Sequence, residues 1–185
     1  MLARMTRVVR LDRAVYPEVE SDPTATLTAA AVVVLVAVAG VVGTGLQIAV
    51  GTAPRSAHPP GAIAGSLLGP VLHWLIWSAL TFAIGTTLFG GRTTYPTMLR
   101  ALGYAQAPQV LAVLGFLPLV GPVCVVLGQL LSLRAGSLAA QDALGLPMRR
   151  TIAAILVSFA VAFVVRGAVT ALLAHVSLLS GLVSP

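Results

Sequence analysis

Few side chains in this sequence could carry chemistry, and they do not form groups. The chain has three histidines, His58, His73 and His175. None has a carboxylate nearby at a spacing that suits a metal ion. Cys124 is the only cysteine, which excludes a disulfide within the chain and a cysteine-based metal site. Asp142 is the only acid after Asp22, so a carboxylate pair for acid–base catalysis is not available within the membrane. We therefore expect no catalytic site, no bound metal, no cofactor and no enzyme activity.

His73 stands one helical turn before Trp77 in an uncharged apolar stretch. Tryptophan is enriched where a transmembrane helix meets the membrane surface, so we expect a hydrogen-bonded histidine at that interface. Axial ligation of a haem or chlorin by His73 or His175 is the alternative. A glycine-rich phosphate loop followed by lysine is missing, which argues against nucleotide hydrolysis.

The polar segment around Tyr104, Gln106, Pro108 and Gln109 is the strongest candidate for a functional site. Pro108 has no backbone N–H, so a helix that continues through it has a free carbonyl at or near membrane depth. Polar side chains beside a broken helix are typical of a binding cleft or a path for small solutes. A simple proline kink, with the free carbonyl satisfied by Gln106 or its neighbours, is the structural alternative.

Arg134 is the second candidate, because it stands inside another apolar stretch. It follows Pro122 by twelve residues, and Gln106 precedes Pro118 by twelve residues. In a helical hairpin that turns between the two prolines, both side chains would lie about 18 Å below the turn. We expect Arg134 either to extend toward the cytoplasm or to form a hydrogen bond with Gln106 inside the bundle.

Composition places the chain among membrane proteins. Apolar residues make up 58% of it, charged residues only 9%, and the mean hydropathy is +1.00. Soluble domains carry about 25% charged residues. With 185 residues the chain suits a single domain. We therefore expect an integral membrane protein surrounded by the lipid bilayer.

The apolar residues occur in stretches of membrane length, since about 20 such residues cross roughly 30 Å of hydrocarbon. The expected spans are about 27–50, 66–89, 96–117, 121–142 and 149–174. They predict an all-α, polytopic transmembrane helical bundle over residues 27–184. A basic N-terminal interfacial segment over residues 1–26 precedes it.

The region 101–133 could be a hairpin of two spans or one kinked span, because Pro118 and the Gly121-Pro122 pair interrupt it. Short cytoplasmic loops carry an excess of arginine. In the hairpin model nine of the eleven arginines lie in the cytoplasmic half, whereas a single span would nearly erase this bias. Only Arg55 and Arg166 then lie opposite, with Arg166 close enough to the outer interface to reach it. We predict five spans, with the N-terminus cytoplasmic and the C-terminus outside.

The first 26 residues mix arginines with acids and precede a full-length span, so we expect no cleavable signal. One basic, partly apolar face could lie on the inner leaflet, formed by Arg7, Arg10, Leu11, Ala14 and Val15. An exposed arm that docks a partner is the alternative. The net charge of +6 is spread along loops without a recognition motif, so we expect no nucleic-acid binding.

Small residues at four-residue spacing are common in the predicted helices, where they allow helices to approach closely in lipid. The stripes are Ala79-x-x-x-Ala83-x-x-x-Thr87, Thr81-x-x-x-Gly85, Ala135-x-x-x-Ala139 and Gly167-x-x-x-Ala171. They could pack the bundle internally, or they could bind a second copy or a partner subunit.

Several segments of the chain resemble the prokaryotic branch of the Yip1 family. They are Arg10-Leu-Asp-Arg-Ala-Val-Tyr-Pro-Glu-Val-Glu-Ser-Asp-Pro23, Trp74-Leu-Ile-Trp77, Ile84-Gly-Thr-Thr-Leu-Phe-Gly-Gly91 and Leu99-Arg-Ala-Leu-Gly-Tyr-Ala-Gln-Ala-Pro108. The resemblance implies a small membrane protein of five spans, related to eukaryotic proteins that work with Rab GTPases in vesicle traffic. It assigns no chemistry to these residues. Ala140-Gln-Asp-Ala-Leu144 departs from the family's usual Arg-Gln-Ala-Leu-Asp order.

Three functions fit the sequence. A non-enzymatic scaffold of the cell (inner) membrane, which organises protein partners or lipid, fits the lack of catalytic groups, the small-residue stripes and the resemblance. A small-solute transporter or channel fits Gln106, Arg134 and the proline-broken helices. An accessory subunit of a larger membrane complex is the third. We expect the protein partner to be another membrane protein or a second copy of the chain.

Overall fold

The computed structural model describes residues 1–53 and 59–183, with the side chains of all but 59, 170 and 173–183. These residues form helices and contain no β-strand, which confirms the expected all-α class. The helices are α1 (Leu2–Val9), α2 (Val15–Ser21), α3 (Ala25–Ala49), α4 (Pro59–Thr87), α5 (Tyr95–Ala105), the 3₁₀ helix η1 (Ala107–Phe116), α6 (Val120–Leu144) and α7 (Met148–Val183).

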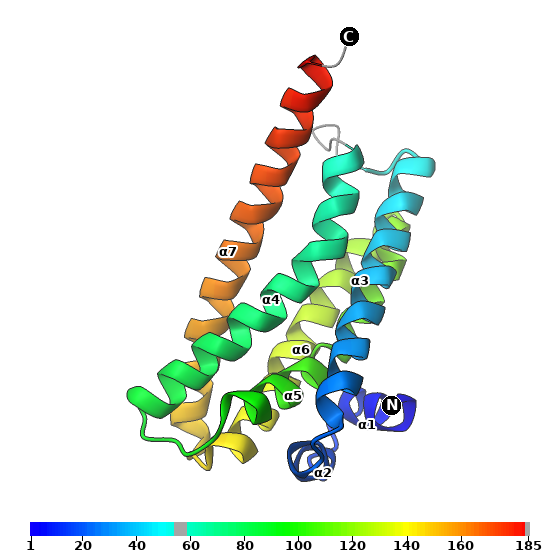
Figure 1. The fold of residues 1–185 in the computed structure, drawn as a ribbon. Coiled ribbons are helices and arrows are strands. Elements are labelled where there is room, and N and C mark those ends of the chain that lie inside the picture. Colours follow the sequence, from blue (N-terminus) through cyan, green and yellow to red (C-terminus); the bar gives the residue numbers. More distant parts are fainter. Residues whose placement is uncertain (54–58, 184–185) are drawn as a thin grey trace.

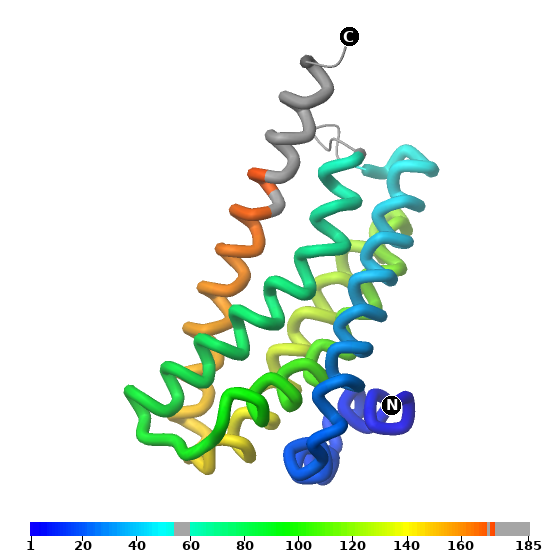
Figure 2. Tube along the Cα trace, viewed as in Figure 1, coloured from blue at the N-terminus to red at the C-terminus, as the bar shows by residue number. Residues whose placement is uncertain are grey.

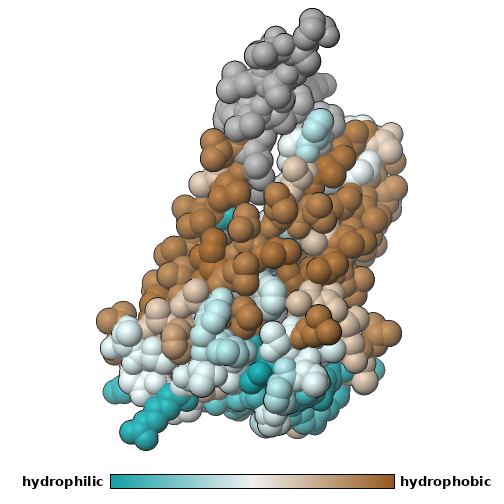
Figure 3. Space-filling model, in the orientation of Figure 1, coloured by the Kyte–Doolittle hydropathy of each residue, from teal (hydrophilic) through white to brown (hydrophobic). Residues whose placement is uncertain are grey.

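Four helices in the described part of the chain are long and apolar enough to cross a membrane: α3, α4, α6 and α7. In Figure 1, α4 lies between α3 and α7, while α1 and α2 sit together at one end of the bundle. The space-filling view in Figure 3 shows hydrophobic residues over most of the visible face and hydrophilic residues at that same end. A hydrophobic surface of this kind, bordered by polar residues at one end, is typical of a helical bundle that lies in a membrane.

The segment in which we expected one span, 96–117, is not a single helix. It is an α-helix of 11 residues followed by a 3₁₀ helix of 10 residues. Pro108 explains the change, because it has no N–H for the carbonyl four residues earlier and its ring clashes with that turn. The chain tightens instead, and the Gln109 N–H donates to the Gln106 carbonyl three residues back, at 2.9 Å. Figure 2 follows the chain from α4 through the lower connection into this segment.

Two glycines on neighbouring helices allow η1 to pack unusually close. Gly43 of α3 lies against the Ala112 carbonyl, which a Cβ at position 43 would overlap. On the other side, a Cβ at Gly128 of α6 would lie 3.0 Å from the Pro108 carbonyl oxygen. Runs of 3₁₀ helix longer than three or four residues are uncommon. Here the run lies between α3 and α6, and these glycines leave room for its backbone.

The N-terminal helices pack against the bundle. Their buried side chains are Met5, Val8, Val15, Tyr16 and Val19. They contact α5, η1 and α6, and the Arg100 side chain donates to the Glu20 carbonyl at 2.8 Å. Val15, expected on a membrane-facing surface, is buried in the protein. Binding of the remaining basic face to the inner leaflet stays a prediction.

The connections at this end of the bundle also touch one another. Gly90 turns the chain after α4 with φ of +72°, a conformation that glycine adopts without steric cost. Beyond it, the Arg92 N–H donates to the Leu144 carbonyl at the end of α6, at 3.1 Å. Arg13 donates to Gln141 at 2.5 Å. The N-terminal segment, the 88–94 connection and the end of α6 therefore lie at the same end.

Candidate functional site

Gln109 is the member of the predicted polar segment that joins two elements. It is buried on η1, and its Nε2 donates to the Ser132 hydroxyl of α6 at 3.0 Å. Its Oε1 accepts from Gln129 Nε2 of α6 at 3.5 Å. Both partners stand on α6 about one turn apart, so Gln109 fixes η1 against that helix.

Tyr104 and Gln106 are fully buried but differ in their bonding. The Tyr104 hydroxyl donates to Thr28 Oγ1 at 2.8 Å and ties α5 to α3. Neither amide atom of Gln106 has a hydrogen-bond partner in the described part of the chain. Pro108 lies in the first turn of η1, where a missing N–H costs nothing.

The predicted contact between Gln106 and Arg134 is wrong. Gln106 points into the protein and bonds to nothing described, while Arg134 is exposed. We expected this contact because both residues lie equally far from the turn of the hairpin. Distance from the turn does not determine, however, on which face of its helix a residue lies. On α6 the inward face is formed by Ser132, Ala135 and Gly136, and Arg134 lies off that face.

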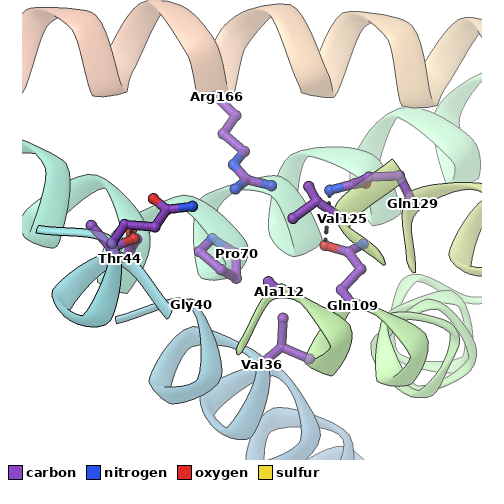
Figure 4. Close-up of a pocket in the computed structure, with 11 residues that line it drawn as sticks. Val36, Gly40, Thr44, Pro70, Gln109, Ala112, Val125, Gln129 and Arg166 are labelled. Carbon is purple, nitrogen blue, oxygen red and sulfur yellow. Dashed lines mark hydrogen bonds between the residues drawn. The ribbon is translucent and has the colours of Figure 1, made fainter. Parts of the chain in front are cut away.

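A polar cavity of about 150 Å³ lies in the half of the bundle away from α1 and α2. It is bounded by α3, α4, η1, α6 and α7, and Figure 4 shows Arg166 reaching into it from α7. Its polar lining residues are Thr44, Gln47, Ser66, Gln109, Gln129 and Arg166. The expectation that Arg166 reaches out to the interface is therefore not met. A Cβ at Gly69 would lie 2.9 Å from Arg166 Nε, so Gly69 leaves the space through which this side chain turns inward.

Several polar side chains around the cavity donate to other protein groups. Gln47 Nε2 donates to the Gly115 carbonyl at 2.8 Å, and Ser66 Oγ donates to the Ala62 carbonyl at 2.9 Å. Since Ser66 gives its proton to Ala62, Thr44 must donate to Ser66, 2.7 Å away. Gln129 Oε1 is buried without a partner among the described residues. The cavity is thus lined by the Arg166 guanidinium as its charged donor, by the second N–H groups of the glutamine amides and by Gln129, whose Oε1 has no described partner.

His73 is fully buried in an aromatic cluster inside the bundle. Its ring centroid is 5.4 Å from that of Trp77 and 5.1 Å from that of Phe159 on α7. Neither ring nitrogen has a hydrogen-bond partner of good geometry within the described residues, so the expected hydrogen bond is not found. His58 lies outside the described residues, as does the side chain of His175. The described residues hold no group of three or more His, Cys, Asp or Glu side chains that could bind a metal.

Charged residues cluster outside the membrane-length helices, on α1, α2 and the turns beside them. Arg7 pairs with Asp12 and Glu18, each at 2.8 Å, and Arg4 pairs with Asp22 at 2.9 Å. Hydrogen bonds from Thr24 and Arg4 lower the pKa of Asp22 to about 2. Much of the basic charge on this segment is therefore neutralised within the protein.

Glu20 behaves in the opposite way to Asp22. Burial, together with the nearby Asp142 carboxylate, raises the pKa of Glu20 to about 7, although Arg100 opposes the shift. Its Oε1 has no hydrogen-bond partner in the described structure. Burial of this acid could not be inferred from the sequence, because it depends on how α2 docks against the bundle.

Comparison with known proteins identifies the family of the chain. A family model described as Yip1 domain matches residues 10–170. Comparison with curated proteins and with solved structures finds no match. The matched region contains α3, α4, α5, η1, α6 and most of α7, including three helices of membrane length in full. The chain is an integral membrane protein that belongs to the Yip1 family.

Proposed function

We propose that this protein is a non-enzymatic organising protein of the cell (inner) membrane, which binds another membrane protein or a second copy of itself through an outward helix face. One observation carries the proposal. The stripe Ala79, Ala83 and Thr87 on α4 is exposed. Small side chains in lipid let a second helix approach closely and gain packing contacts.

The second stripe of small residues on α4, Thr81 and Gly85, packs inside the bundle. Thr81 and Gly85 are buried, and a Cβ at Gly85 would lie 2.6 Å from Leu144 Cδ2 of α6. Ala135 and Ala139 are likewise fully buried. One face of α4 thus packs the bundle, whereas the face with Ala79 and Ala83 remains available for another helix.

Ala83→Leu tests this proposal, since a bulky side chain there would keep a partner helix at a distance. We expect the variant to lose a copurifying protein, or its own dimer, in mild detergent, with little change in melting temperature. Ala31→Leu is the matched control, because Ala31 is exposed on α3. Equal association of wild type and Ala83→Leu would contradict the proposal.

We further propose that the chain crosses the membrane five times, with a cytoplasmic N-terminus. The arginines near α1 and α2, Arg92, and the α6–α7 connection lie at one end, in keeping with an arginine-rich cytoplasmic side. An α-helix rises 1.5 Å per residue and a 3₁₀ helix about 2.0 Å. By this count α5 and η1 together reach about 36 Å, which exceeds the roughly 30 Å of hydrocarbon.

Two single cysteines in a Cys124→Ser background separate five spans from four. If α5 and η1 cross, Leu119→Cys reacts with an impermeant thiol reagent outside intact cells, and Pro147→Cys reacts only after lysis. If they do not cross, both results reverse. Leu119 and Pro147 are exposed, so each new thiol is reachable.

A small-solute transporter is the second candidate, and the polar cavity beside Gln109 and Arg166 favours it. Purified protein in liposomes would then carry a small anion at a rate that falls in Arg166→Gln. Flux that is the same with and without the protein would remove this candidate and leave the organising role.

A further inference from the structure

Arg166 carries a positive charge that the protein itself does not balance. The ion pairs found among the described residues involve Arg4, Arg7 and Arg13, and Arg166 takes part in none. No hydrogen bond from its guanidinium appears in the described structure. A charged side chain within a membrane-length helix is costly unless it is paired or solvated, and such residues commonly mark a binding site.

The surroundings of Arg166 have the form of a small, defined site. The guanidinium enters the cavity of about 150 Å³, a size that holds a molecule of about six heavy atoms. No Asp or Glu lines the cavity. Gly69 leaves room for the side chain to turn inward, because a Cβ there would lie 2.9 Å from Nε. The charge therefore faces a space that can hold an anion.

The remaining groups define which anion fits. The amide nitrogens of Gln47, Gln109 and Gln129 each use one of their two N–H groups on another protein group. Gln129 Oε1, by contrast, is a buried acceptor without a donor in the described chain. A ligand that pairs with both groups has an anionic oxygen, which accepts from the Arg166 guanidinium, and an O–H group, which donates to Gln129 Oε1.

We infer that the cavity binds a phosphate-class oxyanion that also carries a hydroxyl donor. Inorganic phosphate has both features, because its mono- and dibasic forms keep an O–H. The headgroup of phosphatidylglycerol has them as well, in its phosphodiester and its glycerol hydroxyls, and with about ten heavy atoms it would extend beyond the cavity. Sulfate lacks the hydroxyl and binds more weakly. This inference concerns ligand chemistry and does not depend on the organising role or on transport.

Binding to purified protein in detergent tests the inference, with two probes that separate the sources. Inorganic phosphate is compared with sulfate by thermal shift at equal ionic strength, and phosphatidylglycerol is titrated into the protein with bound lipid counted by native mass spectrometry. A rise in melting temperature with phosphate would identify the ligand as a free anion. Binding that saturates at one phosphatidylglycerol per protein, with no effect of phosphate on the melting temperature, would identify the ligand as a lipid headgroup.

Variants of the lining then test the assignment. Arg166→Gln should weaken binding of the effective probe about 10- to 100-fold, the usual value of one charge-assisted hydrogen-bond pair. Gln129→Leu should remove the preference for phosphate over sulfate or, for lipid, for phosphatidylglycerol over phosphatidylethanol, whose headgroup has no hydroxyl. Arg134→Gln is the matched control, because it removes one exposed positive charge outside the cavity and should leave saturable binding unchanged.

Ala112→Leu is a second variant that tests the same inference if Arg166→Gln does not fold. Ala112 lines the cavity, so leucine there fills the space while Arg166 is retained. We expect it to abolish binding of the effective probe. The inference is overturned if neither probe binds, which would leave Arg166 solvated by water alone. It is also overturned if binding survives in both Arg166→Gln and Ala112→Leu, or is lost equally in Arg134→Gln.

Discussion

Trp77 of α4 lies directly over Gly136 of α6, so closely that a Cβ at position 136 would be 2.6 Å from Trp77 Cζ2. The indole is fully buried and also meets Phe159 of α7, with ring centroids 5.2 Å apart. This single tryptophan thus touches two neighbouring helices. Its position depends on the missing side chain at Gly136.

Gly136→Ala should therefore destabilise the protein. Adding a methyl group against a large, enclosed ring costs about 1–3 kcal/mol, more than the roughly 1 kcal/mol that alanine gains over glycine in a helix. We expect a lower melting temperature in detergent. Gly45→Ala is the control, because nothing lies within 4 Å of its Cβ position, and it should be neutral or stabilising. A melting temperature of Gly136→Ala at or above wild type would show that Trp77 can move aside.

Gln109 and Gln106 should respond differently to the same substitution. Gln109→Leu removes the bond to Ser132 and should cost about 0.5–1.5 kcal/mol, the range for side-chain bonds within membranes. Gln106→Leu removes a buried amide without described partners and should be neutral or stabilising. Denaturation in detergent micelles measures both variants.

A double-mutant cycle with Ser132→Ala isolates the Gln109 contact. The losses in Gln109→Leu and Ser132→Ala should not add, because each change removes the same hydrogen bond. Additive losses would mean that Gln109 and Ser132 act independently. A large loss in Gln106→Leu alone would mean that this amide has a partner after all, for example a bound lipid.

The contribution of Glu20 to stability should fall as pH rises from about 4.5 to about 7. The pKa of Glu20 is raised to about 7 from an ordinary 4.5, so the folded state binds its proton more tightly than the unfolded state does. The stabilisation is complete below the unfolded pKa and is lost as pH passes the folded pKa. Melting temperature as a function of pH measures the effect.

Glu20→Gln supplies the comparison for this pH profile. Glutamine imitates the protonated acid, so the variant should lack this part of the decline and be more stable than wild type at about pH 8. Glu18→Gln, an exposed neighbour on the same helix that pairs with Arg7, is the control. Parallel profiles for wild type and Glu20→Gln would show that Glu20 is solvated in the protein.

Asp142→Asn should have a small effect on stability. Asp142 faces the half-exposed Arg13 at 3.7 Å, and such surface pairs are worth about 0–1 kcal/mol. If the protein is non-enzymatic as proposed, the change should abolish no turnover. Loss of a robust catalytic activity in this variant alone would overturn the non-enzymatic proposal.

The sequence by itself determined the class of the protein and several local features. Uncharged stretches of membrane length predicted α3 and α4, because run length and composition are properties of a continuous segment. The segments resembling the Yip1 family were likewise readable, and the family match confirms them.

Tertiary structure alone decided which polar side chains meet. In a soluble protein the apolar stripe of a helix shows which face is inward, but helices in lipid are apolar all round because the tails are as apolar as the core. Nothing in the sequence therefore showed that Arg166 turns inward or that Gln109, not Gln106, forms hydrogen bonds with α6. Those directions follow from close packing at Gly69 and Gly128, where the missing side chains admit an arginine and the backbone of η1.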